Sequence, residues 1–181
     1  MSGEFEDEYS ATIDDDLSGP EVMGGAGDAL ATDTIAVLSP AEPICLPETA
    51  TVREAVQTML AQRQAGVLVT DAAGRLVGIF TERDVLTRVV GKDLDARRTP
   101  LSAVMTRNPE ALTARDRVAY AVHCMSVAGY RTIPLVDPEG RPIGIVTVSD
   151  VVRWLANLFP EATLNLRPGD AIKNPQEVDA G

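Results

Sequence analysis

Two stretches of the sequence combine a hydroxyl and a carboxylate at the same spacing. Thr81 with Asp84, and Thr147 with Asp150, each form a Thr-x-x-Asp pair. A threonine hydroxyl can donate a hydrogen bond to a phosphate, and an ionised aspartate offers two acceptor oxygens to a sugar diol. Each pair follows a Gly-Ile dipeptide in an apolar run, where a glycine lets a ligand or another backbone approach the strand closely. These residue types favour recognition of a phosphorylated sugar at the start of a helix.

The same spacing also describes a capping box, in which a threonine and a later acidic residue close the first turn of a helix. Thr51-x-x-Glu54 and Thr113-x-x-Asp116 show this spacing without a preceding Gly-Ile strand. The spacing alone therefore favours helix capping, and only its position after a buried strand points to a ligand. Both interpretations stay open.

Basic and apolar residues near the two pairs extend the candidate site. Arg83 lies inside the first pair and Arg131 precedes an apolar strand; a guanidinium suits a phosphate, although either residue could be a solvated surface arginine. Three residues could form an apolar wall for a base or could belong to the core: Tyr130, Ile133 and Pro134. Their counterparts near Gly66 and Val67 would contact a base mostly through the backbone. Because Ser149 stands where the first pair has Arg83, we expect the two sites to bind unequally.

Other reactive residue types form no recognisable catalytic or metal site. His123 is the one histidine and adjoins Cys124, so the two side chains cannot face a single site on a helix. This argues against zinc. The sequence has no glycine-rich phosphate loop and no nucleophile elbow. We interpret Cys45 and Cys124 as packing residues and expect no catalysis.

The elements that position these residues come from a repeat of 66 residues. Twelve identities recur at this shift without a gap, among them Asp84 with Asp150 and Gly74 with Gly140. Helical apolar spacing, β-branched runs and Asp-x-x-Gly turns predict strand, helix, strand, strand, helix in each copy. The expected ranges are 44–46, 52–60, 66–69, 76–80 and 82–90, then 116–128, 132–136, 143–146 and 148–158. A single copy of about 55 residues would bury too little surface, so we expect the two to share a core.

Acidic residues are concentrated before the repeat. Residues 1–40 hold ten acids and no Lys or Arg, which is 10 of the net 11 negative charges. This segment has few large apolar side chains, so we expect most of it to be disordered, although part of 28–38 could form a short helix. The acidic charge and 4% aromatic content argue against a nucleic-acid partner. We expect a cytoplasmic protein, because the sequence lacks a membrane span and a signal peptide and its two cysteines suit a reducing compartment.

The paired repeats resemble the CBS (cystathionine-β-synthase) domain pair, or Bateman module. The resemblance rests on Gly-Ile-x-Thr-x-x-Asp at 78–84 and 144–150, Ile-Pro-Leu-Val-Asp at 133–137, and Val-Met-Thr at 104–106. The first copy departs from the pattern, with Leu68 where the second has Pro134. The resemblance implies an α+β fold of two β-α-β-β-α repeats packed with pseudo-twofold symmetry. The expected divisions are an acidic leader at 1–37, repeats at 38–98 and 99–159, and a loose tail at 160–181.

The resemblance also implies a function. Two clefts between the repeats would bind an adenosine ligand (AMP, ADP, ATP or S-adenosylmethionine), with the motif aspartates on the ribose and the threonines on the phosphate. Such modules commonly form homodimers through their helices. We therefore expect a stand-alone regulatory sensor that signals occupancy to an unidentified partner protein, without a nucleic-acid or membrane partner. The alternative is a constitutive interaction or scaffold module with clefts that do not bind.

Overall fold

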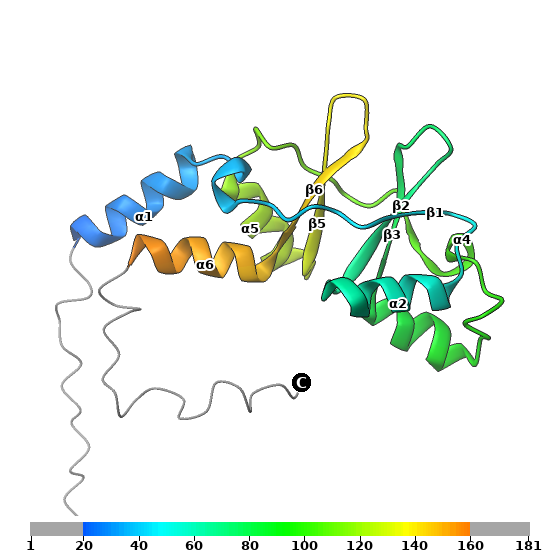
Figure 1. Ribbon diagram of the computed structural model, residues 1–181. Helices are drawn as coiled ribbons and strands as arrows, with labels where there is room; N and C mark the ends of the chain where they lie inside the picture. Colours follow the sequence, from blue (N-terminus) through cyan, green and yellow to red (C-terminus); the bar gives the residue numbers. More distant parts are fainter. Residues whose placement is uncertain (1–19, 160–181) are drawn as a thin grey trace, which may run out of the picture.

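Residues 20–159 are described by the computed structural model, in which two similar α+β units lie next to each other (Figure 1). The hairpins of the two units project to the same side of the molecule. This architecture confirms the predicted α+β fold of tandem repeats. In the described part of the chain, no helix has the length and apolar character needed to cross a bilayer.

The first unit is a sheet in the order β1-β2-β3-β4 with helices packed against it. β1 is parallel to β2, and the other neighbouring strands are antiparallel. Its elements are β1 (Cys45–Pro47), α2 (Val52–Gln62), β2 (Gly66–Thr70), β3 (Leu76–Thr81), α3 (Glu82–Asp84), the π-helical turn η3 (Val85–Val89), the 3-10 turn η4 (Val90–Lys92), α4 (Leu101–Val104) and β4 (Thr106–Arg107).

The second unit repeats this plan around a two-stranded hairpin. Its elements are α5 (Val118–Val127), β5 (Thr132–Val136), β6 (Pro142–Thr147) and α6 (Val148–Leu158). Single bridges flank the hairpin: Leu112 pairs in parallel with Leu135, and Ala41 pairs antiparallel with Ile145. By the 66-residue shift, the Leu112 bridge is the counterpart of β1, and the Ala41 bridge takes the edge that β4 takes in the first unit.

The two hairpin turns form as their sequences predict. Gly74 and Gly140 have φ values of 78° and 79°, which lie in the left-handed region that favours glycine. The Asp71 carboxylate accepts two backbone N–H bonds within its turn, from Ala73 and Arg75, both at 2.9 Å. Asp137 does the same in the second turn. These local bonds fix where each hairpin reverses.

Each unit is completed by a segment at the start of the other unit's repeat. We call residues 33–41 the first lead-in segment and residues 99–107 the second. The Val118 N–H donates to Asp33 O at 3.0 Å, and its counterpart bond runs from Val52 N–H to Thr99 O, also at 3.0 Å. Figure 1 shows the first lead-in passing from the end of α1 across β6 to β1. The chain therefore crosses between the units twice.

The hydrophobic cores follow this crossing. Leu101, from the second lead-in, is 0% exposed in the first unit's cluster, and Ile35, from the first lead-in, is 0% exposed in the second unit's cluster. The single shared core that we expected is instead two cores joined by a small third cluster of Leu68, Ile79 and Ile145. A Leu76 N–H to Gly140 O bond of 2.9 Å also links the units.

The segment before the repeat is more ordered than its composition suggests. α1 (Pro20–Thr32) and the 3-10 turn η2 (Ile35–Leu38) occupy most of residues 20–38, where we expected disorder and at most a short helix. Ala29 and Leu30 of α1 pack on the second unit's core, and the Arg117 guanidinium donates to Thr32 O. Tertiary packing therefore stabilises a helix that its own sequence does not favour. Residues 1–19 and the expected tail at 160–181 lie outside the described residues.

Two predicted helices also differ from their expected form. The run 82–90 is divided into α3, η3 and η4, because its backbone shifts to π-type hydrogen bonding after Asp84. The helix expected at 116–128 spans Val118–Val127. The expected divisions at residues 38, 99 and 160 remain predictions about the sequence repeat.

Candidate ligand site

The first Thr-x-x-Asp pair lies where β3 enters α3. The Thr81 backbone N–H and its hydroxyl both donate to Asp84 Oδ2, at 2.9 and 2.8 Å. Among the described residues, Asp84 is the one charged residue classed as buried, at 7% exposed. Its second oxygen, Oδ1, lies 3.2 Å from Nε of Arg88.

The second pair has the same geometry at the start of α6. Thr147 donates to Asp150 Oδ2 from its N–H at 2.8 Å and from its hydroxyl at 2.7 Å. Asp150 Oδ1 lies 3.1 Å from the Arg153 guanidinium. Both pairs are therefore capping boxes, and in both the carboxylate keeps one oxygen that the cap does not use. Capping and ligand binding are compatible on these residues.

Gly66 and Arg131 lie beside the two caps. Gly66 pairs with Thr81 across β2 and β3, and a Cβ on Gly66 would come within 3.2 Å of the Thr81 methyl. The Val148 N–H at the start of α6 donates to Arg131 O at 3.2 Å, and Glu82 N–H makes the counterpart bond to Ala65 O. The structure therefore brings these backbone segments to the helix starts in both units.

The other predicted site residues divide by exposure. Val67, Ile133 and Pro134 are almost fully buried. For Ile133 and Pro134, burial in the protein is the alternative that the sequence left open. Tyr130 is 41% exposed. Arg83 and Arg131 are exposed, and neither forms an ion pair within residues 20–159. Their guanidinium groups are thus available to an anion.

The glycines of the two Gly-Ile dipeptides leave space for the lead-in segments to pack closely against β3 and β6. A Cβ on Gly78 would overlap Met105 Sδ, and a Cβ on Gly144 would lie 3.2 Å from Pro40 Cβ. Met105 and Pro40 belong to the second and first lead-ins respectively. We had allowed these glycines to admit a ligand or a backbone, and in this structure they admit the crossing chain.

A residue that the sequence analysis missed is Gln64. It lines a cavity of about 440 Å³ with residues 42–46, Thr58 and Gln62, and its Nε2 donates to Glu42 O at 2.9 Å. Its Oε1 is buried and accepts no hydrogen bond from the described residues. A buried acceptor without a donor is costly, so this atom calls for an explanation. The repeat contained the signal, because Gln64 is the counterpart of Tyr130 at the 66-residue shift.

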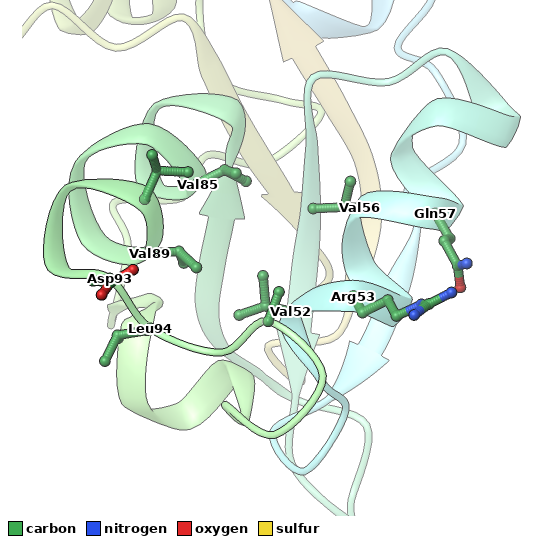
Figure 2. A pocket seen from close by; sticks show the side chains of 10 residues that line it. Val52, Arg53, Val56, Gln57, Val85, Val89, Asp93 and Leu94 are labelled. Atoms are coloured by element: carbon green, nitrogen blue, oxygen red, sulfur yellow. The ribbon is translucent and has the colours of Figure 1, made fainter.

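A second cavity, of about 490 Å³, lies between α2 and the turns η3 and η4 and contains none of the predicted ligand residues (Figure 2). Figure 2 shows Val52 and Val56 of α2 facing Val85 and Val89. In the second unit, α1 packs over the counterpart helices α5 and α6. This cavity is therefore part of a helix-packing surface that α1 covers in one unit only.

Comparison with known proteins identifies the class of fold. A family model described as the CBS domain matches residues 36–91 and again residues 101–157. The two matches coincide with the two copies of the Thr-x-x-Asp site. The chain belongs to the CBS domain family and carries a pair of these domains.

One of the relatives is a plant protein of much greater length. The CBS domain-containing protein CBSCBSPB5 of Arabidopsis thaliana is 29% identical over 147 residues, which is 81% of this chain and 26% of the relative. The chain thus spans about a quarter of the length of that relative.

Two solved structures share the fold over nearly their whole length. The CBS domain protein PAE2072 from Pyrobaculum aerophilum, complexed with AMP, is 28% identical, with a TM-score of 0.64 over 72% of this chain and 99% of that one. The CBS-domain containing protein ATU1752 from Agrobacterium tumefaciens is 27% identical, with a TM-score of 0.61 over 67% of this chain and 98% of that one.

Proposed function

We propose that this chain is a regulatory module that binds an adenine nucleotide through Asp84 and Asp150 and passes the occupancy on to a partner protein. The observation that carries the proposal is the shared geometry of the two aspartates. Each is held by a threonine through one oxygen and keeps a second oxygen beside an arginine. The AMP complex of the similar protein PAE2072 supports this class of ligand.

The chemistry of the site suits a nucleoside monophosphate. The carboxylate oxygens that the caps do not use lie beside Arg88 and Arg153. By sharing or replacing these arginine contacts, they can accept hydrogen bonds from the two hydroxyls of a ribose. The exposed guanidinium groups of Arg83 and Arg131 offer charge to the phosphate. AMP, ADP, ATP and S-adenosylmethionine all carry the adenosine part.

The crossing of the chain between the two units offers a way to transmit ligand occupancy. A ligand that contacts both units binds better to one relative packing of them than to another, and this difference in affinity shifts the population. The lead-in segments place residues from the start of each repeat in the other unit's core, which supports such a coupling. A partner protein that binds only one arrangement of the two units would then respond to whether the ligand is bound.

Calorimetric titration with AMP, ADP, ATP and S-adenosylmethionine tests the binding. We expect heat with at least one ligand, and a loss of about tenfold or more in affinity at one site for Asp84→Ala or Asp150→Ala. Asp116→Ala is the matched control. Asp116 Oδ2 accepts the same two bonds from Thr113, at 2.6 and 3.0 Å, but it is not preceded by a Gly-Ile strand.

Two results would reject the nucleotide sensor. The first is the absence of heat with all four ligands from a folded wild-type chain. The second is an equal loss of binding in Asp116→Ala. The constitutive scaffold predicts instead that the aspartate variants lose about 1 kcal/mol of stability each, the usual worth of a helix cap, with no ligand response to alter.

We also propose that two copies associate through their helices. Leu86 and Val90 are 65% and 66% exposed beside the valine-lined cavity, and a second copy would bury them. Sedimentation equilibrium measures this directly. A cytoplasmic location and the lack of catalysis stay predictions from the sequence.

A further inference from the structure

The arginines that pair with the two motif aspartates differ in how many contacts fix their side chains. Arg88 pairs with Asp84 through Nε, and its Nη1 also donates to Val104 O at 2.9 Å, so its side chain is fixed at two points. The Arg88 side chain is 37% exposed. Arg153 pairs with Asp150 through one nitrogen and is 68% exposed, and its guanidinium makes no second bond within residues 20–159.

The backbone after Asp84 supports this difference. Residues Val85–Val89 form a π-helical turn, whereas the counterpart residues in α6 continue as a regular α-helix. π-helical turns are rare and often occur at functional sites. Arg88 lies within this turn. Its counterpart in the second unit is Trp154, which donates to Asp33 rather than to the motif aspartate.

The anchor of Arg88 lies in the crossing chain. Val104 is the last residue of α4 in the second lead-in and is 3% exposed in the first unit's core. Arg88 therefore joins the carboxylate of the first site to the segment that leads into the second repeat. A ribose that takes Asp84 Oδ1 must replace or share the Arg88 bond.

We propose that Arg88 is a positioning residue that restrains the first site, so that an adenine nucleotide binds first at Asp150 and at Asp84 only when Arg88 is released. This inference rests on the proposed function and adds the order of binding. Releasing Arg88 breaks two contacts, whereas releasing the exposed Arg153 breaks one. Since a solvent-exposed ion pair contributes little free energy, the release of Arg88 costs more than the release of Arg153.

Titration with AMP in single-site backgrounds tests this order. In Asp150→Ala, where the first site remains, adding Arg88→Met should tighten AMP binding about tenfold, the factor expected for one competing charge-assisted hydrogen bond. In Asp84→Ala, where the second site remains, adding Arg153→Met should change the affinity by less than about twofold. The wild-type chain should bind its first equivalent of AMP more tightly than Asp150→Ala does.

Arg75→Met is the matched control for the loss of an arginine. Arg75 forms an ion pair with Asp71 at 2.8 Å in the first hairpin turn and touches neither motif aspartate. Added to Asp150→Ala, it should leave AMP affinity unchanged. Arg88→Lys serves if Arg88→Met does not fold, because lysine keeps the charge but lacks the forked donors that reach both Asp84 and Val104. We expect intermediate tightening from it.

The outcomes separate this inference from the proposed function. If AMP binds through both aspartates but neither Arg88 variant tightens the first site, Arg88 does not restrain it and the inference is overturned. Weaker binding in Arg88→Met overturns it as well, since Arg88 would then contact the ligand. If no variant and no wild-type sample binds AMP or the other three ligands, the proposed function itself fails.

Discussion

At the scale of single residues, a second partner separates the ligand candidates from plain caps. Four threonines bond to a carboxylate three residues later, but only two of these carboxylates also pair with an arginine among the described residues. The plain caps are Thr51 with Glu54 and Thr113 with Asp116. The arginine-paired caps are Thr81 with Asp84 and Thr147 with Asp150. The sequence spacing cannot make this distinction, because it is the same in all four.

The caps and turns predict how stability depends on pH. Hydrogen bonds from Thr51 hold the pKa of Glu54 below its usual value, and bonds from Arg75 hold the pKa of Asp71 below its own. A carboxyl whose pKa is lower in the folded chain stabilises it above the unfolded pKa, and this stability is lost as pH falls through the folded pKa. We therefore expect stability to decline below about pH 5.

Thermal melts from pH 7 to about pH 3 measure this loss. Glu54→Gln and Asp71→Asn should each show a smaller drop across that range than the wild type, because the titrating group is gone. If both variants lose as much stability as the wild type across that range, other carboxyls are responsible for the pH dependence. Glu139→Gln, at an exposed position in the second turn, is a suitable control.

At the scale of elements, the sequence predicted the strands and caps well and the crossing chain not at all. The strand at 132–136 and the helix at 148–158 are confirmed to the residue, since β-branched runs and helical apolar spacing mark them. A 66-residue repeat shows that Ile35 corresponds to Leu101, but it does not show against which copy either side chain packs. The π-helical turn was also missed, because apolar spacing does not specify the hydrogen-bond register.

The crossing explains why the motif carries a glycine, and it gives a prediction. Gly78→Ala places a methyl group against the buried Met105 side chain, so we expect a loss of about 1–3 kcal/mol from overpacking. Met105→Ala alone should cost about 2–5 kcal/mol through the cavity it leaves. In the double variant the new methyl group occupies part of that cavity.

Urea unfolding of the two single variants and the double variant measures the coupling. We expect the double variant to lose less stability than the sum of the two, by about 0.5–3 kcal/mol. Additive losses would show that the two side chains do not share this space. Gly25→Ala, where an added Cβ meets nothing within 4 Å, controls for the change from glycine.

At the scale of the whole molecule, the two repeats in the sequence are not the two folded units. Residues 33–41 lead into the first repeat but pack in the second unit, and residues 99–107, which begin the second repeat, pack in the first unit. The position of the Thr-x-x-Asp pairs at two helix starts could be predicted from the sequence, because each pair is local to its helix start. Gln64 was not predicted, although it is the counterpart of Tyr130 at the 66-residue shift. A polar residue in a connecting segment belongs to no helical or strand pattern that would single it out.

This interleaving predicts that the two units unfold together. Leu101 is 0% exposed in the first unit, so Leu101→Ala should cost about 2–5 kcal/mol there. Trp154 is the one tryptophan in the sequence and packs in the second unit's core, so its fluorescence reports on that unit. Because the lead-in segments tie the cores together, we expect Leu101→Ala to shift the Trp154 transition in urea by the same amount as the circular dichroism transition. Ile35→Ala, the counterpart change in the second unit, should shift both probes as well. A Trp154 transition that stays at its wild-type midpoint in Leu101→Ala, while circular dichroism shows an earlier phase, would mean that the units unfold independently and that the crossed chain does not couple them.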